Sequence, residues 1–137
     1  MRERVSLFIY ENGRVLFFNR LKEGRNYHVA IGGGVEVGET VVEAAHREAK
    51  EETNYDIVLG AQLWLRELPN DHREYAYLVT QFSGELTLGG PELARQTPTN
   101  RHIFQWIPLA QLPELKLFPG SIGSVQMGRL REALSCK

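Results

Sequence analysis

The 137-residue sequence contains one cysteine, and this scarcity excludes a disulfide-stabilised fold. The cysteine is Cys136, one residue from the end of the sequence, where we do not expect a catalytic thiol. A single cysteine is typical of proteins in a reducing compartment, so the sequence predicts a cytoplasmic location.

Basic excess and long apolar runs are also missing. Sixteen Lys and Arg against seventeen Asp and Glu give a formal net charge of −1, whereas nucleic-acid binders are typically basic. No apolar run is long enough to span a bilayer, and the opening Met1-Arg2-Glu3-Arg4 does not resemble a signal peptide. We therefore expect neither a nucleic-acid nor a membrane partner. A small anionic ligand, bound through local positive groups or a metal, remains compatible with this charge.

The first third of the sequence predicts a β-hairpin and a third strand. Apolar residues alternate or cluster over 5–9 and 15–18, on either side of Asn12 and Gly13. Asn-Gly is typical of a type I′ turn, which needs positive φ at both central residues. The stretch 27–31 indicates a short strand that ends at three glycines.

The rest of the chain interleaves strand and helix patterns without regular βαβ alternation. The predicted elements after residue 55 are two β-like segments over 56–68 and 74–82, a surface loop over 89–100, a strand over 102–107 closed by Pro108, and a helix with apolar spacing at Val125, Leu130 and Leu134. Composition and length suit one hydrophobic core. We expect a single domain over 1–137, of the α/β class, with a mixed sheet flanked by helices.

A short helix is predicted over about 40–53. Thr40 followed three residues later by Glu43 forms a capping-box signature at its start. Asn54 follows its end, and asparagine is the commonest residue after glycine in the left-handed conformation that ends helices.

The glutamates of this helix lie on an unexpected face. At about 100° per residue, Glu48, Glu51 and Glu52 fall in the same arc as the alanines that should face the sheet, and Arg47 lies toward the opposite side. A solvated charged face would place the glutamates opposite the alanines. Like charges four residues apart weaken a helix by about 0.2–0.5 kcal/mol, and burial increases the repulsion unless a cation lies between them. Converging carboxylates suit Mg²⁺, which prefers oxygen ligands.

The segment GGGVEVGETVVEAAHREAKEETNYDI resembles the Nudix box, Gly-x5-Glu-x7-Arg-Glu-U-x-Glu-Glu-x-Gly-U, where U is a bulky aliphatic residue. Its glycine and charged positions before the final glycine are all present, as Gly33, Glu39, Arg47, Glu48, Glu51 and Glu52. The sequence departs from the box at Asn54, which replaces the final glycine, and at Ala49 and Tyr55, which replace aliphatic residues.

The resemblance implies a Nudix-type α/β/α sandwich with a mixed β-sheet and a catalytic loop-helix-loop. It also implies hydrolysis of a nucleoside diphosphate linked to another moiety. A nucleoside triphosphate giving monophosphate and pyrophosphate is the first choice, because the domain is small. Nucleotide sugars and dinucleoside polyphosphates are the alternatives, as is a non-catalytic nucleotide-binding module. An isomerase on the same fold is less suited, because the cysteine is in the tail.

The resemblance also implies roles for single residues. Glu48, Glu51 and Glu52 would hold Mg²⁺, with Mn²⁺ as a possible substitute, and with Arg47 they form the expected catalytic group. Arg47 and Glu39 would hold the loop-helix-loop together, the alternative for Arg47 being an exposed ion pair. The general base would be a glutamate of the helix or of a later loop.

Substrate contacts are expected from residues beside the helix. Gly32, Gly33 and Gly34 would let the backbone approach the phosphates, or would simply form a turn. Arg20, at the end of a strand, is a candidate phosphate contact, and Glu92 a candidate extra ligand or base. The partner is thus a small nucleotide, bound by a monomer or a homodimer.

Overall fold

The computed structural model describes residues 1–89, 96–97 and 99–135. Cys136, expected to have no catalytic role, and Glu92, a candidate extra ligand or base, lie outside the described residues. The strands and helices in chain order are β1 (Arg2–Glu11), β2 (Arg14–Lys22), β3 (Arg25–Gly34), α1 (Val41–Thr53), β4 (Asp56–Val58), β5 (Gln62–Leu68), β6 (His72–Val79), β7 (Gln81–Ser83), β8 (Asn100–Pro108), the 3-10 helix η1 (Leu109–Glu114), β9 (Leu117–Phe118) and α3 (Ser124–Ser135).

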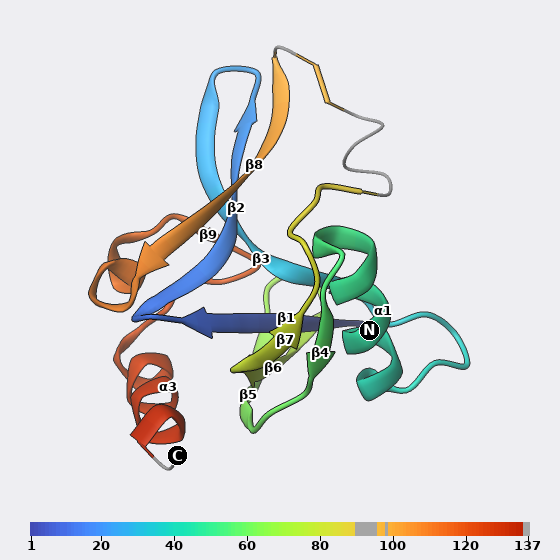
Figure 1. The fold of residues 1–137 in the computed structure, drawn as a ribbon, viewed down its shortest axis with the longest axis vertical. Coiled ribbons are helices and arrows are strands. Elements are labelled where there is room, and N and C mark those ends of the chain that lie inside the picture. The colour runs from blue at the N-terminus through green and yellow to red at the C-terminus, as the bar shows by residue number, and fades with distance from the viewer. Residues whose placement is uncertain (90–95, 98, 136–137) are drawn as a thin grey trace.

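A mixed seven-stranded sheet forms the centre of the fold (Figure 1). Its order is β5-β6-β1-β2-β3-β9, with β8 paired to β2 and a further pairing between β1 and β3. Strand β1 lies parallel to β6 and antiparallel to β3. Strands β4 and β7 form a separate two-stranded ladder.

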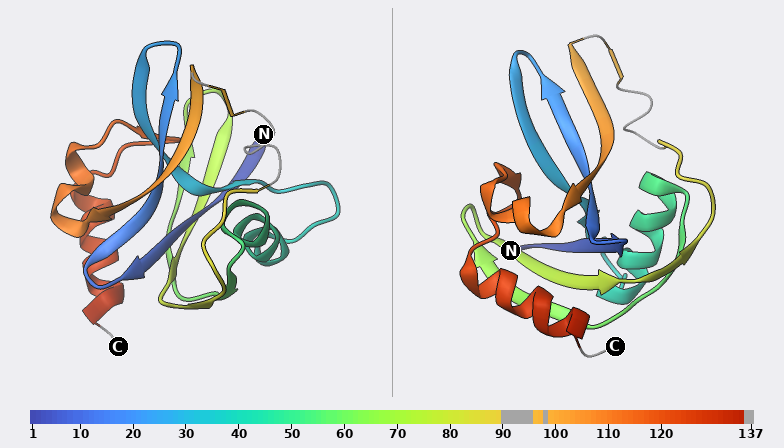
Figure 2. Two further views of the ribbon diagram at one scale, coloured as in Figure 1. Left: turned by 45° about the horizontal axis from the view of Figure 1, so that its top comes forward. Right: turned by 60° about the vertical axis from the view of Figure 1, so that its left-hand side comes forward.

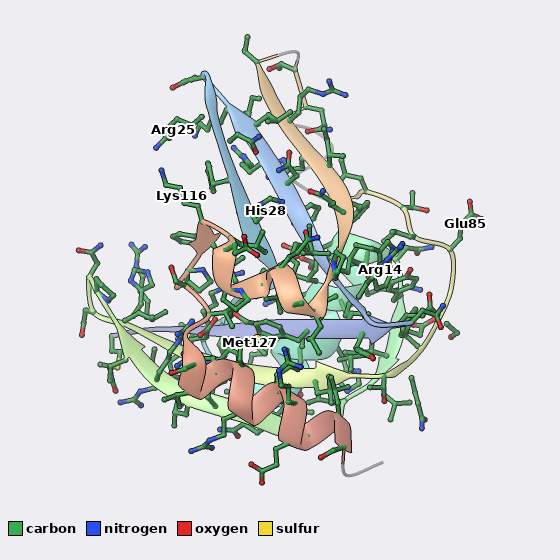
Figure 3. All side chains as sticks on the ribbon, turned by 90° about the vertical axis from the view of Figure 1, so that its left-hand side faces the viewer. Arg14, Arg25, His28, Glu85, Lys116 and Met127 are labelled. Atoms are coloured by element: carbon green, nitrogen blue, oxygen red, sulfur yellow. The ribbon has the colours of Figure 1, made fainter. Side chains whose placement is uncertain are left out.

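Helices cover opposite faces of the sheet around β1 (Figure 2). The face toward α1 buries Val5, Leu7 and Ile9 of β1 against the alanines of the helix. The face toward α3 buries Phe8 of β1, and Met127 of α3 points toward the sheet on this side (Figure 3). The mixed sheet flanked by helices is therefore confirmed. No helix of the described segments is long and apolar enough to cross a membrane.

The predicted hairpin between β1 and β2 is confirmed. Asn12 and Gly13 form its turn with φ of 52° and 81°, and Glu11 pairs with Arg14. Both central residues thus adopt the left-handed conformation that this turn requires.

The strand expected to stop before the glycines continues through them. β3 ends at Gly34 because its glycines pair with β1, in the register Ser6 with Gly32 and Val5 with Gly33. Gly32 has φ of +136°, and a Cβ added there would lie 2.0 Å from the carbonyl oxygen of Val5. Only glycine fits this position without displacing the neighbouring backbone.

The two long β-like segments are each divided. The first breaks at Gly60, which crosses β6 so closely that an added Cβ would lie 2.4 Å from the carbonyl oxygen of Leu78. Its first part, β4, then pairs with β7 at the end of the second segment. The alternation of apolar and polar residues did not predict that β4 pairs with β7, because this alternation continues across Gly60.

The last helix has a different buried face from the predicted one. Val125 is 64% exposed, whereas Met127 and Leu130 are buried against the sheet and Leu134 is partly buried. The helix itself is confirmed, and its buried face begins at Met127 and not at Val125.

Glycine substitutions test the close contact between β1 and β3. We expect Gly32→Ala to lower the free energy of unfolding by at least about 2 kcal/mol, because the new Cβ meets backbone at a strained φ. Gly128→Ala is the control, since nothing lies within 4 Å of a Cβ added to this helical position. It should raise stability by about 0.5–1 kcal/mol. Urea unfolding followed by circular dichroism measures both, and equal effects would contradict the packing described.

Candidate active site

Helix α1 begins and ends as its sequence predicts. The Thr40 side chain accepts from the Glu43 amide at 3.0 Å, and Glu43 Oε1 accepts from the Thr40 amide at 2.8 Å, which completes the capping box. Asn54 ends the helix with φ of 70°, in the left-handed conformation that the usual glycine would adopt. Its side chain donates to the carbonyl oxygen of Glu85 at 3.0 Å. These caps fix the two ends of α1.

Two carboxylates of α1 lie against the glycines of β3. Glu52 is 9% exposed, and its Oε1 accepts a hydrogen bond of 2.9 Å from the Gly32 amide. The Glu48 carboxylate occupies the space in front of Gly33, where an added Cβ would lie 2.5 Å from Glu48 Oε1. Glycine is therefore needed at 33 for a second reason, because it leaves room for the Glu48 carboxylate directly on the backbone.

Arg47 connects the helix to the loop before it. Its guanidinium donates to both oxygens of Glu39, from Nε at 2.7 Å and from Nη2 at 2.9 Å. It also donates to the Gly34 carbonyl at 3.0 Å, to Glu48 Oε1 at 2.9 Å and to Glu51 Oε2 at 3.3 Å. The side chain is 23% exposed, so the expected position on the open side of the helix is wrong. The loop bearing Glu39 folds over it, and the arrangement is that of a clamp and not of an exposed ion pair.

The clamp shifts the pKa values of its members. Hydrogen bonds from Arg47, and then from the backbone amide of Glu36, lower the pKa of Glu39 to about 2. The hydrogen bond to Glu39 is also the main reason that the pKa of Arg47 is raised. Burial raises the pKa of Glu48, and the hydrogen bond from Arg47 opposes this shift. Glu48 is thus a desolvated carboxylate whose charge is offset mainly by Arg47 and also by Arg4.

The three predicted ligands are not brought together equally. Glu48 and Glu52 lie side by side on the glycine backbone, whereas Glu51 is 46% exposed and directed toward Arg47. Over the residues that the structure describes, no three His, Cys, Asp or Glu side chains are grouped as a metal site. The expected convergence of three carboxylates is therefore not found there. Two carboxylates still fit Mg²⁺, which is usually bound by one or two carboxylates together with substrate phosphates and water.

Arg20, the predicted phosphate contact, lies on a strand and not on the glutamate helix. Arg20 is on β2, and its guanidinium contacts the imidazole of His102 on β8. Its Nε is buried without a hydrogen-bond partner among the described residues. The hydrogen bonds described connect Arg20 to β8 and not to the glutamates of α1.

Sequence reasoning missed a set of buried polar residues on the other face of β1. Arg4, Ser6 and Glu74 lie there, and Glu74 is only 1% exposed. A signal existed in the alternation of β6, which places Glu74 on the same face as Ala76 and Leu78. A carboxylate on an otherwise apolar strand face needs a partner, and the sequence did not show which.

Comparisons with known proteins place this site in a family. The NUDIX domain family matches residues 1–126, most of the chain. The chain belongs to the Nudix family, which confirms the resemblance drawn from the motif. Its members are phosphoanhydride hydrolases, and this is the class of enzyme to which the chain is assigned. No curated protein matches the chain.

Solved structures share the whole fold. The E. coli ORF135 protein has 22% identity and a TM-score of 0.69, covering 99% of this chain and 89% of that one. A MutT NUDIX hydrolase from Burkholderia pseudomallei has 21% identity and a TM-score of 0.72, covering 94% and 97%. An ADP-ribose pyrophosphatase from Streptococcus suis has 17% identity and a TM-score of 0.68, covering 97% and 91%. These likenesses confirm the α/β/α sandwich.

The Glu39–Arg47 pair gives a pH-dependent stability. The pKa of Glu39 is about 2 in the folded protein and about 4.5 ordinarily, so its contribution is complete above pH about 5. It is lost as the pH falls from about 4.5 toward 2. We expect wild type to be more stable than Glu39→Gln at pH 6, and the difference to vanish near pH 2. Urea unfolding with EDTA measures it.

The control for this experiment is Glu114→Gln. Glu114 is exposed at the end of η1, and no ion pair to it is described. This variant should follow wild type at every pH. A difference between wild type and Glu39→Gln that persists unchanged to pH 2 would contradict the ion pair.

Proposed function

We propose that this chain is a Mg²⁺-dependent pyrophosphohydrolase that cleaves a nucleoside diphosphate linked to another moiety. The observation that carries the proposal is the placement of Glu48 and Glu52 on the backbone of Gly32 and Gly33. Two adjacent carboxylates beside an open glycine backbone form an oxygen-rich edge that suits a hard divalent ion and a diphosphate.

The reaction adds water across one phosphoanhydride bond. For a nucleoside triphosphate, water attacks phosphorus at one end of the α,β bridge, the bond from that phosphorus to the bridging oxygen breaks, and the products are the monophosphate and pyrophosphate. A nucleoside triphosphate is the first candidate because the domain is small. A nucleotide sugar is the second, favoured by the structural likeness to an ADP-ribose pyrophosphatase.

The residues of α1 have separate roles in this proposal. Glu48 and Glu52 would hold Mg²⁺, and Mn²⁺ would substitute, with Glu51 joining when it leaves Arg47. When bound, the ion offsets the charge of the diphosphate oxygens and acidifies the attacking water. Arg47 orients Glu48 by its hydrogen bond of 2.9 Å and holds the loop through Glu39.

The proposal also includes the cellular location and the binding partner of the enzyme. We place it in the cytoplasm because the chain has a single cysteine. Its partner is a small nucleotide, which a near-neutral chain binds through a metal and local arginines and not through an extended basic surface.

Substitution of Glu52 tests the catalytic assignment. We expect Glu52→Gln to lower kcat by at least about a hundredfold, because it removes a ligand charge next to the reacting phosphate. The measurement is release of pyrophosphate or phosphate from a panel of nucleoside triphosphates and nucleotide sugars with Mg²⁺. Glu43→Gln is the matched control on the same helix, since glutamine at this position retains the capping box. Equal activity of both variants would contradict the assignment.

Gly33→Ala tests the carboxylate position without removing a ligand. An added Cβ lies 2.5 Å from Glu48 Oε1, the end of a flexible side chain, so Glu48 must move while the fold is retained. We expect Mg²⁺ affinity to fall by about tenfold or more, measured by calorimetric titration without nucleotide. Unchanged affinity would show that Glu48 does not hold the ion where this structure places it.

A further inference from the structure

A pocket of about 290 Å³ is lined by Gly34, the last of the three glycines of β3. Its lining includes Arg4 and Gly34 of the β1–β3 pair, Leu68 and His72 at the turn between β5 and β6, and Phe118 and Pro119 at β9. Gly34 also accepts a hydrogen bond from Arg47. The pocket therefore begins one residue after Gly33, over which the Glu48 carboxylate lies, a suitable position for the group attached to a diphosphate.

Two side chains of the pocket are suited to hold a planar or polar group. Phe118 is 52% exposed, and the Arg4 guanidinium lies 5.8 Å from the centre of its ring. Arg4 also donates to the Ala30 carbonyl at 2.7 Å and to Ser6 Oγ at 3.3 Å. These two hydrogen bonds use two of its five N–H donors. Arg4 therefore has donor capacity for a bound molecule.

Both sides of the pocket are joined to one buried carboxylate. Glu74 Oε2 accepts from Ser6 Oγ at 2.7 Å, and Ser6 is the residue that accepts from Arg4. Glu74 Oε1 accepts from Trp64 Nε1 at 2.8 Å and from Arg66 Nε at 2.7 Å. Glu74 is thus linked to Arg4 on one side and to Arg66 on the other.

Arg66 links Glu74 to the segment that contains Phe118. Its Nη2 donates to the Gly120 carbonyl at 3.1 Å and its Nη1 to the Ser121 carbonyl at 2.9 Å. A Cβ added to Gly120 would lie 2.8 Å from Arg66 Nη2, so the contact is close. The 117–118 strand is itself tied to β3, and Lys116 lies near Arg25 and His28 in Figure 3.

A contribution to folding stability does not by itself account for the buried carboxylate of Glu74. Replacing a buried ion pair by apolar residues of similar volume is often neutral or stabilising, because desolvation offsets the attraction. Here Glu74, 1% exposed, lies on a strand face shared with Ala76 and Leu78, which an apolar residue would fill well. The carboxylate instead connects Arg4, which lines the pocket, through Ser6 with Arg66, whose guanidinium holds the carbonyls that follow the lining residues Phe118 and Pro119.

We propose that Glu74 is a positioning residue for substrate binding, which sets the Arg4 and Phe118 sides of this pocket so that it receives the group linked to the diphosphate. The inference rests on the proposed function for the identity of that group. Glu74 itself does not touch the substrate. Through Ser6 it positions Arg4, and through Arg66 it positions the segment that contains Phe118.

The test is a comparison of KM with kcat for Glu74→Gln, using the substrate found with the nucleotide panel. We expect KM to rise about tenfold, the scale of one hydrogen bond to a charged group, and kcat to change by less than about threefold. Glu67→Gln is the matched control, because Glu67 is an exposed glutamate of β5 paired with Arg73. It should leave both constants unchanged. Arg66→Lys keeps the positive charge but loses the reach to the two carbonyls, so its KM should rise similarly.

Direct binding separates this proposal from the hydrolase assignment. The probes are α,β-methylene-ADP and α,β-methylene-GDP, whose bridges resist hydrolysis, titrated calorimetrically with Mg²⁺. An approximately tenfold weaker Kd for Glu74→Gln and Arg66→Lys supports the positioning role, even if wild type hydrolyses nothing. Turnover with unchanged KM and Kd in both variants overturns the positioning role and leaves the hydrolase assignment intact. No binding of either probe to wild type, or a loss confined to kcat, also overturns it. Arg66→Lys decides the matter if circular dichroism shows Glu74→Gln unfolded.

Discussion

The close approach of α1 to the glycine backbone of β3 is the contact on which the site depends. Glycine at 32 and 33 lets the strand pair with β1 and lets Glu52 and Glu48 lie directly on its other side. The missing Cβ of Gly32 allows the pairing with β1, and the Gly32 amide donates to Glu52. Buried alanines on α1 allow the helix to lie near enough for this contact. The same glycines therefore serve the sheet, the helix and the chemistry.

Charge is balanced around this contact by two arginines that act on opposite faces. Arg47 clamps the outer side through Glu39, Glu48 and Gly34. Arg4 lies on the inner side, where burial lowers the pKa of its guanidinium and the nearby carboxylates, first that of Glu52, oppose the shift. A hydrolase for a polyanionic substrate needs carboxylates to bind metal, and cations that keep these carboxylates charged when they are desolvated. Both arginines meet that need while Glu48 and Glu52 keep their contacts with Gly33 and Gly32.

Local sequence patterns predicted the features whose causes are local. The hairpin at Asn12 and Gly13, the caps at Thr40 and Asn54 and the spacing of the box each depend on a few consecutive residues. The Arg47 position and the exposure of Glu51 were predicted less well. A helical wheel places a side chain by its angle alone, whereas a loop eight residues earlier in the chain determines where the Arg47 guanidinium points.

The sequence by itself determined the family, the helix that carries the glutamates and the class of chemistry, because periodicity, capping and motif spacing are properties of neighbouring residues. Only the tertiary structure decided that two of the three glutamates lie on the glycines, that β4 pairs with β7, and that Glu74 joins the two sides of a pocket. These depend on contacts between residues far apart in the chain. Ser6 and Glu74 are 68 positions apart, and no local pattern specifies the partner of a buried carboxylate.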